Sequence, residues 1–224
     1  MQITDFEFEE RLYKKGCCAV AGADEAGRGA WAGPIAGAAV ILPRDFASFG
    51  ITLRDSKLLT EKERERLFEI IIKISRAYKI VILDNTAIDK YGINAANVRV
   101  LASSITSLSP IPDFALIDGL KAKFDLSIPF SQIPHGDQRI ASIAAASILA
   151  KVTRDRIMKQ LDLMHQNYGF AKHKGYGTAL HKNCLSRFGV SNIHRKSYAP
   201  IRDLPLCRNQ IQSNQSKTSL IRTK

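Results

Sequence analysis

An apolar run that ends in two adjacent carboxylates constrains this chain most. Residues 19–23 have the pattern of a buried strand, and Asp24 and Glu25 follow directly. Buried carboxylates are costly unless a partner compensates their charge, and Mg²⁺ and Mn²⁺ prefer oxygen ligands. Consecutive strand residues point to opposite faces, so we expect the chain to turn here if both acids serve one site. The segment Gly27-Arg28-Gly29 predicts that turn and adds a positive charge suited to phosphate.

The same segment matches the loose dinucleotide-binding pattern Gly-x-Gly-x-x-Ala. In that fold a helix begins at the loop, and Gly33-Pro34 would break such a helix within its first two turns. Another apolar run, residues 35–42, follows instead. The sequence therefore predicts strand, loop and strand, and the nucleotide-binding fold is rejected.

Length and charge narrow the class of protein. The chain has 224 residues, a net charge of +12 and a pI near 9.7. This balance favours anionic partners, with nucleic acid ahead of a membrane surface. There is no apolar run of about 18 residues that would span a membrane, and the acidic N-terminus lacks the apolar core of a secretory signal. The four cysteines show no C-x-x-C spacing, so we expect reduced thiols in a cytoplasmic protein.

Apolar runs and helical periodicities alternate along the chain, which predicts an α/β fold. Thr60 and Glu63 have the spacing of a capping box, and Asn94 and Thr178 are candidate helix caps. The expected helices cover 3–14, 60–76, 94–107, 139–165 and 178–188, and the expected strands cover 19–23, 35–42, 78–83 and 114–117. Loops are expected at 170–177 and 191–201, a loop or weak strand at 125–130, and a basic, disordered tail at 204–224.

Two further carboxylates repeat the logic of the first pair. Asp118 ends a short apolar run and precedes Gly119, while Asp137 stands at the expected start of the long helix, where a capping role is also open. Open sheets gather their sites at the carboxyl ends of strands. Four acids without a Cys or His partner therefore predict a site for Mg²⁺ or Mn²⁺, with two ions expected.

The second half of the chain is strongly basic. Residues 151–202 contain eleven Lys and Arg residues, opposed only by Asp155 and Asp162. This excess favours a surface that contacts a phosphate backbone. Combined with the carboxylates, it predicts phosphodiester hydrolysis, in which the ions activate water and stabilise the charged transition state.

Five motifs stand out along the chain: residues 22–29 (GADEAGRG), 55–57 (DSK), 116–119 (LIDG), 144–155 (AAASILAKVTRD) and 173–178 (HKGYGT). In this order and spacing, they resemble bacterial ribonuclease HII over residues 19–202. The resemblance implies a ribonuclease H-like mixed β-sheet flanked by helices, a catalytic domain over residues 1–203 and a small C-terminal helical part over about 165–203. It implies a monomer that cleaves the RNA strand of RNA–DNA hybrids and single ribonucleotides in duplex DNA, leaving 3′-OH and 5′-phosphate ends.

The resemblance also assigns roles to residues. It implies that the loop Gly27-Arg28-Gly29 senses the ribose 2′-OH and that Tyr176 packs against the sugar at the junction. The family commonly has Lys-Gly-Asp where this chain has His135-Gly136-Asp137, which removes a positive charge at neutral pH. Its catalytic and metal-binding carboxylates correspond to Asp24, Glu25, Asp118 and Asp137.

Three other interpretations account for fewer of these residues. Another ribonuclease H-like nuclease, such as a junction resolvase, would not need to read a 2′-OH, and a non-catalytic binding module would not need clustered acids. Ribonuclease HIII is disfavoured because it carries an extra N-terminal domain and lacks Gly-Arg-Gly. Two residues are expected to lie outside the chemistry: Asp155 as a salt-bridge partner and His173 as a solvated loop residue.

Overall fold

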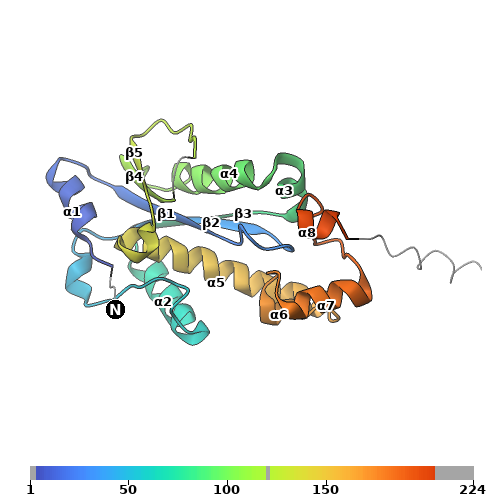
Figure 1. Ribbon diagram of the computed structural model, residues 1–224. Coiled ribbons are helices and arrows are strands. Elements are labelled where there is room, and N and C mark those ends of the chain that lie inside the picture. Colours follow the sequence, from blue (N-terminus) through green and yellow to red (C-terminus); the bar gives the residue numbers. More distant parts are fainter. Residues whose placement is uncertain (1–3, 120–121, 205–224) are drawn as a thin grey trace, which may run out of the picture.

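A five-stranded mixed sheet forms the centre of the structure, with the strand order β3-β2-β1-β4-β5 (Figure 1). The computed structural model describes residues 4–119 and 122–204. The first three strands pair antiparallel, and β4 and β5 continue the sheet in parallel with β1. This arrangement confirms the mixed sheet. The strands are β1 (Val20–Ala26), β2 (Ile35–Ile41), β3 (Ala77–Leu83), β4 (Phe114–Asp118) and β5 (Phe130–Ile133).

Helices cover both faces of the sheet (Figure 1). One layer contains α3 and α4, which packs on β2 and β3, and the other contains α5, which packs on β1 and β2 with α2 outside it. Helices α6 and α7 lie beside the C-terminal end of α5, and α8 lies next to α3 (Figure 1); together they form the expected C-terminal helical part. The helices are α1 (Glu7–Lys14), α2 (Glu61–Ile74), α3 (Asn85–Tyr91), α4 (Ile93–Thr106), α5 (Ala141–Met164), α6 (Phe170–His173), α7 (Ala179–Phe188) and α8 (Ala199–Arg202).

Small residues let both helical layers approach the sheet closely. A Cβ on Gly22 of β1 would lie 2.2 Å from the main chain of Ser142 in α5. A Cβ on Gly37 of β2 would lie 2.8 Å from the Val100 side chain of α4. Residues 144–146 of α5 are fully buried alanines, which confirms the expected buried helix. Since interiors are close-packed, α5 and α4 are held at fixed positions on either side of the end of β1.

Local capping chemistry fixes most helix starts. The Thr60 hydroxyl accepts a hydrogen bond from the Glu63 N–H and the Glu63 carboxylate accepts one from Thr60, so the capping box is confirmed. Thr178 caps α7 as expected. The expected cap at Asn94 is wrong, because α4 begins directly after Gly92 and Asn94 lies within its first turn. Gly92 ends α3 and begins α4 with a φ of 79°, which favours glycine.

The long helix α5 receives its cap from a distant part of the chain. It begins at Ala141 after Ile140, which has no capping side chain, so Asp137 is not its N-cap. A carboxylate oxygen of Glu9 in α1 instead accepts a hydrogen bond from the Ser142 N–H at 2.8 Å. Glu9 is fully buried, and this burial raises its pKa to about 7. The interaction joins α1 to α5 but places an ionisable group in the interior.

The remaining differences from the expected elements concern short segments. Helix α6 lies within the expected loop 170–177, and α8 overlaps the end of the expected loop 191–201 and extends one residue beyond it. Strand β5 begins at Phe130, the last residue of the segment 125–130, so most of that segment is loop. The tail from 205 onward lies outside the described residues. None of the helices in the described ranges is long and apolar enough to cross a membrane.

We expect Glu9→Gln to stabilise the protein at pH 8 and to change little at pH 5. A raised pKa means that the folded state holds a proton that the unfolded state has lost, so wild-type stability falls as pH rises from about 4.5 to about 7. The amide keeps an acceptor for the Ser142 N–H. At 1.36 kcal/mol per pKa unit the gain is at most about 3 kcal/mol. Thermal unfolding of both proteins at the two pH values tests this, and an equal difference at both would contradict it.

Candidate active site

The C-terminal ends of two neighbouring strands bring carboxylates together. β1 and β4 are parallel, and Ala23 lies opposite Ile117 in their register. Asp24 and Asp118 are the next residues, so both stand at the same edge of the sheet. This is the edge at which open sheets hold their sites.

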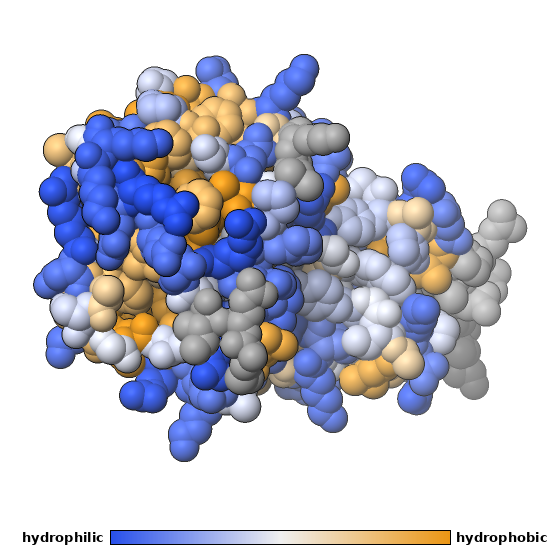
Figure 2. Space-filling view, turned by 60° about the vertical axis from the view of Figure 1, so that its left-hand side comes forward, coloured by the Kyte–Doolittle hydropathy of each residue, from blue (hydrophilic) through white to orange (hydrophobic). Residues whose placement is uncertain are grey.

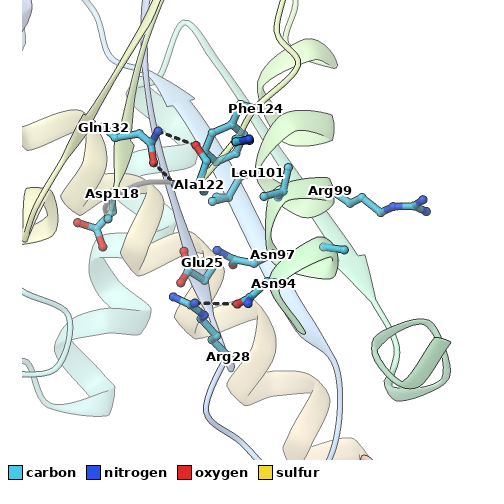
Figure 3. Close-up of a pocket in the computed structure, with 14 residues that line it drawn as sticks. Glu25, Arg28, Asn94, Asn97, Arg99, Leu101, Asp118, Ala122, Phe124 and Gln132 are labelled. Atoms are coloured by element: carbon cyan, nitrogen blue, oxygen red, sulfur yellow. Dashed lines mark hydrogen bonds between the residues drawn. The ribbon is translucent and has the colours of Figure 1, made fainter. Parts of the chain in front are cut away.

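The chain does not turn at the first carboxylate pair. Asp24 and Glu25 still pair with β2, so the strand extends past the expected end at residue 23, and the chain turns at Gly27-Arg28-Gly29, as this segment predicted. Side chains of consecutive strand residues point to opposite faces. Asp24 lies beside Ser147 of α5, and Glu25 lies beside Asn97 of α4 (Figure 3).

These side chains nevertheless interact electrostatically. Burial raises the pKa of Asp24 well above its usual value, and the charges of Glu25 and Asp118 raise it further. The pKa of Glu25 is raised by burial and then by Asp118, although Arg28 opposes the shift. Burial, followed by the charge of Asp137, raises the pKa of Asp118. The edge of the sheet therefore holds more negative charge than the surrounding protein compensates.

Asp137 approaches the group from a short 3₁₀ turn between β5 and α5. It is buried, and its carboxylate accepts a hydrogen bond from the Lys57 ammonium at 3.0 Å. The preceding Gly136 donates its N–H to Asp118 at 2.7 Å, which ties this turn to β4. His135 is exposed, and Lys57 supplies a positive charge beside Asp137. Sequence reasoning missed this role of Lys57, although the motif 55–57 was noted.

The donor set suits a hard divalent cation. Asp24, Glu25, Asp118 and Asp137 offer oxygen ligands, and a cation would relieve the mutual repulsion that raises the pKa of the first three. Across residues 4–119 and 122–204, no three His, Cys, Asp or Glu side chains are grouped so that they could hold an ion as they stand. The fit with Mg²⁺ or Mn²⁺ therefore comes from donor chemistry and charge.

In the loop after β1, the first glycine packs tightly against a neighbouring side chain, whereas the second is exposed. Gly27 has a φ of 95°, and a Cβ there would lie 2.0 Å from Nε of the buried Arg154. Arg28 extends from the loop and donates a hydrogen bond to the Asn94 side chain at 3.0 Å (Figure 3). No atom lies within 4 Å of a Cβ built on Gly29. The main chain at Gly29 is thus accessible to a ligand.

Tyr176 faces the same region from the loop between α6 and α7. Its ring lies 5.3 Å from the Arg154 guanidinium, and the residue is only half-buried, so it is not a core aromatic. Tyr176 lines a cavity of about 220 Å³ together with every other predicted site residue except Asp137. The lining residues are Asp24, Glu25, Ala26, Gly27, Arg28, Gly29, Ser56, Lys57, Asp118, Ser147, Lys151 and Tyr176.

A larger cavity of about 630 Å³ lies on the α4 side of the same edge (Figure 3). Glu25, Arg28 and Asp118 line both cavities. On the far side, the Gln132 side chain is hydrogen-bonded to the main chain of Ala122 through both its amide nitrogen and its oxygen. The carboxylates therefore lie between two hollows, which leaves room for an extended substrate.

Comparison with known proteins agrees with this geometry. The sequence model of the ribonuclease HII family matches residues 21–201. The chain belongs to the ribonuclease HII family. Ribonuclease HII of Caldicellulosiruptor saccharolyticus is 46% identical over 86% of this chain and 93% of its own. Ribonuclease HII of Acholeplasma laidlawii is 44% identical over 91% and 98%. The crystal structure of ribonuclease H2 from Pyrococcus horikoshii superposes with a TM-score of 0.72 at 25% identity, covering 83% and 96%.

Membership of the ribonuclease HII family establishes the class of reaction and the fold. The chain is an endoribonuclease that acts on RNA in RNA–DNA hybrids. The ribonuclease H-like architecture expected from the five motifs is confirmed by the mixed sheet and its neighbours among solved structures.

Asp155 and His173, which were expected to lie outside the chemistry, are both buried. Asp155 is buried, and its carboxylate binds the Lys151 ammonium at 2.7 Å with Arg64 at 3.9 Å, so the expected salt bridge is confirmed. The expected solvated loop position of His173 is wrong, because His173 is buried and stacks on His181.

The basic surface is smaller than the sequence indicates. Arg154, Lys174 and Arg195 all belong to the basic segment 151–202, yet all three are buried. Arg154 and Arg195 donate hydrogen bonds to main-chain carbonyls, among them that of Pro34. Figure 2 brings forward the side of the molecule that lies at the left of Figure 1, and hydrophilic residues predominate there, with apolar residues in smaller patches between them.

Proposed function

We propose that this chain is a metal-dependent endonuclease that cleaves RNA–DNA hybrids and single ribonucleotides within duplex DNA, leaving 3′-OH and 5′-phosphate ends. One observation carries the proposal: carboxylates that raise one another's pKa lie beside an accessible glycine loop and a half-buried tyrosine. The carboxylates suit a cation that binds a phosphate, and the glycine loop and the tyrosine suit a sugar.

Asp24, Glu25, Asp118 and Asp137 would hold Mg²⁺ or Mn²⁺, and two ions are proposed. When bound, such ions activate water for attack on phosphorus and stabilise the charge of the transition state. The protein fixes the carboxylates for this task. Hydrogen bonds from Gly136 to Asp118 and from Lys57 to Asp137 hold two of them in place.

Gly27, Arg28, Gly29 and Tyr176 would bind the ribose. A 2′-OH both donates and accepts a hydrogen bond, so accessible main-chain groups at Gly29 can distinguish RNA from DNA. Tyr176 lines the same cavity and offers a flat ring to the sugar. A junction resolvase would need the carboxylates but not this ribose-binding arrangement, so it explains less of the site.

The oligomeric state and the cellular location are proposed from the sequence and not from the geometry of the site. The chain is proposed to act as a monomer and in the cytoplasm, where RNA–DNA hybrids and ribonucleotide-containing DNA are its nucleic-acid partners. Residues 1–203 are proposed as the catalytic domain.

The test is cleavage of a DNA duplex that contains one ribonucleotide, with an all-DNA duplex of the same sequence as control. With Mg²⁺ we expect a single cut beside the ribonucleotide, no cut in the control, and no cut of either in excess EDTA. The upstream product should support extension by a DNA polymerase, because it ends in a 3′-OH. Cleavage in EDTA, or equal cleavage of both duplexes, would contradict the proposal.

A further inference from the structure

Three buried imidazoles lie in the C-terminal helical part, away from the carboxylates. His173, His181 and His194 are 8%, 0% and 0% exposed. The rings of His173 and His181 stack with their centroids 4.4 Å apart, and His181 and His194 meet through their Nε2 atoms at 2.9 Å. Buried polar groups need hydrogen-bond partners, so the protonation of each ring can be worked out from its neighbours.

Ser191 fixes the direction of the hydrogen bonds in this cluster. Its N–H donates to Nδ1 of His194 at 2.9 Å, so that nitrogen is an acceptor and Nε2 of His194 carries the hydrogen. Nε2 of His181 must then accept, which leaves the hydrogen of His181 on Nδ1. Burial lowers the pKa of both His181 and His194 to about 4, so both rings are neutral near pH 7.

This chain of hydrogen bonds ends on the main chain of Tyr176. Nδ1 of His181 donates to the Tyr176 carbonyl at 3.0 Å. On the other side, Nδ1 of His173 accepts from the Gly175 N–H at 3.1 Å, and the His173 carbonyl accepts from the Tyr176 N–H at 2.9 Å. The loop that carries Tyr176 is therefore held by two imidazoles, each with a single tautomer that satisfies its neighbours.

The same cluster joins this loop to the loop after β1. The Trp31 N–H donates to the Gly175 carbonyl at 2.8 Å, and the Trp31 carbonyl accepts from the Arg195 N–H at 2.8 Å. Ala32 forms a β-bridge with His194, and the Trp31 ring lies 5.7 Å from the His181 ring. The imidazoles thus connect the two loops that line the small cavity.

We propose that His181 is a positioning residue for ribose recognition: its Nδ1–H holds the Tyr176 carbonyl, and His194 fixes the tautomer that makes this donation possible. His181 touches no substrate and acts only through Tyr176. The inference rests on the proposed role of Tyr176 at the ribose. A displaced reacting or binding group costs roughly 10²-fold in rate, so the effect on cleavage is large enough to measure.

Two amide substitutions separate the two bonds of His181. The amide nitrogen of Asn lies near the position of Nδ1, so His181→Asn keeps a donor for Tyr176 and loses the bond to His194. The amide of Gln lies near the position of Nε2, so His181→Gln keeps the contact with His194 and loses the donor to Tyr176. Both replacements are neutral, polar and smaller than the ring, which makes each the control for the other.

On the one-ribonucleotide duplex we expect His181→Gln to lower kcat/KM by about one to two orders of magnitude and His181→Asn by about threefold or less. Affinity for a hybrid, measured in Ca²⁺ to prevent cleavage, should not change, because the phosphate backbone provides most of it. Equal rates in the two variants, whether both active or both inactive, would overturn the proposal. Circular dichroism and thermal unfolding confirm that both fold.

A double-mutant cycle separates positioning from a general structural effect. If His181 acts through Tyr176, His181→Gln should lower the rate of wild type but not the residual rate of Tyr176→Ala. The same fold-loss in both backgrounds would overturn the proposal. If wild type fails to cut the one-ribonucleotide duplex, the proposed function itself fails; if Tyr176→Ala lowers the rate and His181→Gln does not, only this inference fails.

Discussion

Replacing Asp24 by Asn should abolish cleavage and, at the same time, stabilise the folded protein. Asp24 is buried among like charges that raise its pKa, so removing its charge removes a repulsion from the native state. The Asn side chain still offers an oxygen to the Glu25 N–H, which donates to Asp24 at 2.7 Å. Loss of the charge should lower the cleavage rate by at least about 10²–10³-fold, since preorganised groups at developing charge have effects of this size.

The measurement pairs single-turnover rates in Mg²⁺ with thermal unfolding. We expect Tm to rise by a few degrees in Asp24→Asn, because about 1 kcal/mol moves Tm by 2–4 °C in a chain of this size. Asp155→Asn is the matched control, since Asp155 is also buried but is paired with Lys151 at 2.7 Å. That variant should lose stability and keep its intrinsic rate. A less stable Asp24→Asn, or one with a near-normal rate, would contradict the account of this site.

A methyl group at Gly27 should disrupt the loop, whereas the same methyl group at Gly29 should only block the substrate. Gly27→Ala would combine a strained φ of 95° with a Cβ 2.0 Å from the buried Arg154. Arg154 cannot move freely, because it donates to the Pro34 carbonyl at 2.8 Å. Gly27→Ala should therefore lower both stability and the rate on every substrate, the rate by about 10²-fold.

Gly29→Ala has no such conflict, because no atom lies within 4 Å of the new Cβ. We expect a wild-type Tm and a rate on the one-ribonucleotide duplex that falls by about tenfold or more, since the methyl group occupies the approach to the main chain. Gly29→Val should enlarge the effect without a loss of stability. Wild-type cleavage by Gly29→Ala and Gly29→Val would place ribose recognition elsewhere. A Gly27→Ala variant as stable as wild type would contradict the expected conflict with Arg154.

The elements that carry the site were largely predictable because their signals are local. Apolar runs identified the strands that carry Asp24 and Asp118, and the capping box identified the start of α2. The end of the first strand was misplaced at residue 23 because it depends on pairing: β1 continues to Ala26 since Ala36 of β2 stands opposite it. The register between two paired strands depends on both of their sequences, so the composition of one strand alone does not predict it.

Non-local contacts explain the other differences. Arg154 and Arg195 count as surface charge in the sequence, yet main-chain carbonyls of a distant loop receive their hydrogen bonds. His173 looks like a loop residue until α7 brings His181 against its ring. Lys57 is 80 residues from Asp137 in the chain and 3.0 Å from it in space. In each case the partner that decides the role lies far along the sequence.

The most direct test of the central claim is the binding of Mn²⁺, followed by titration calorimetry and by the electron paramagnetic resonance signal of the free ion. The carboxylates at the ends of β1 and β4 are claimed to bind the metal, so wild type should bind Mn²⁺ and Asp24→Asn and Asp118→Asn should each lose most of the affinity. Asp155→Asn, once shown to be folded, should bind as wild type does. Undiminished binding of Mn²⁺ by the folded Asp24→Asn and Asp118→Asn proteins would contradict the claim.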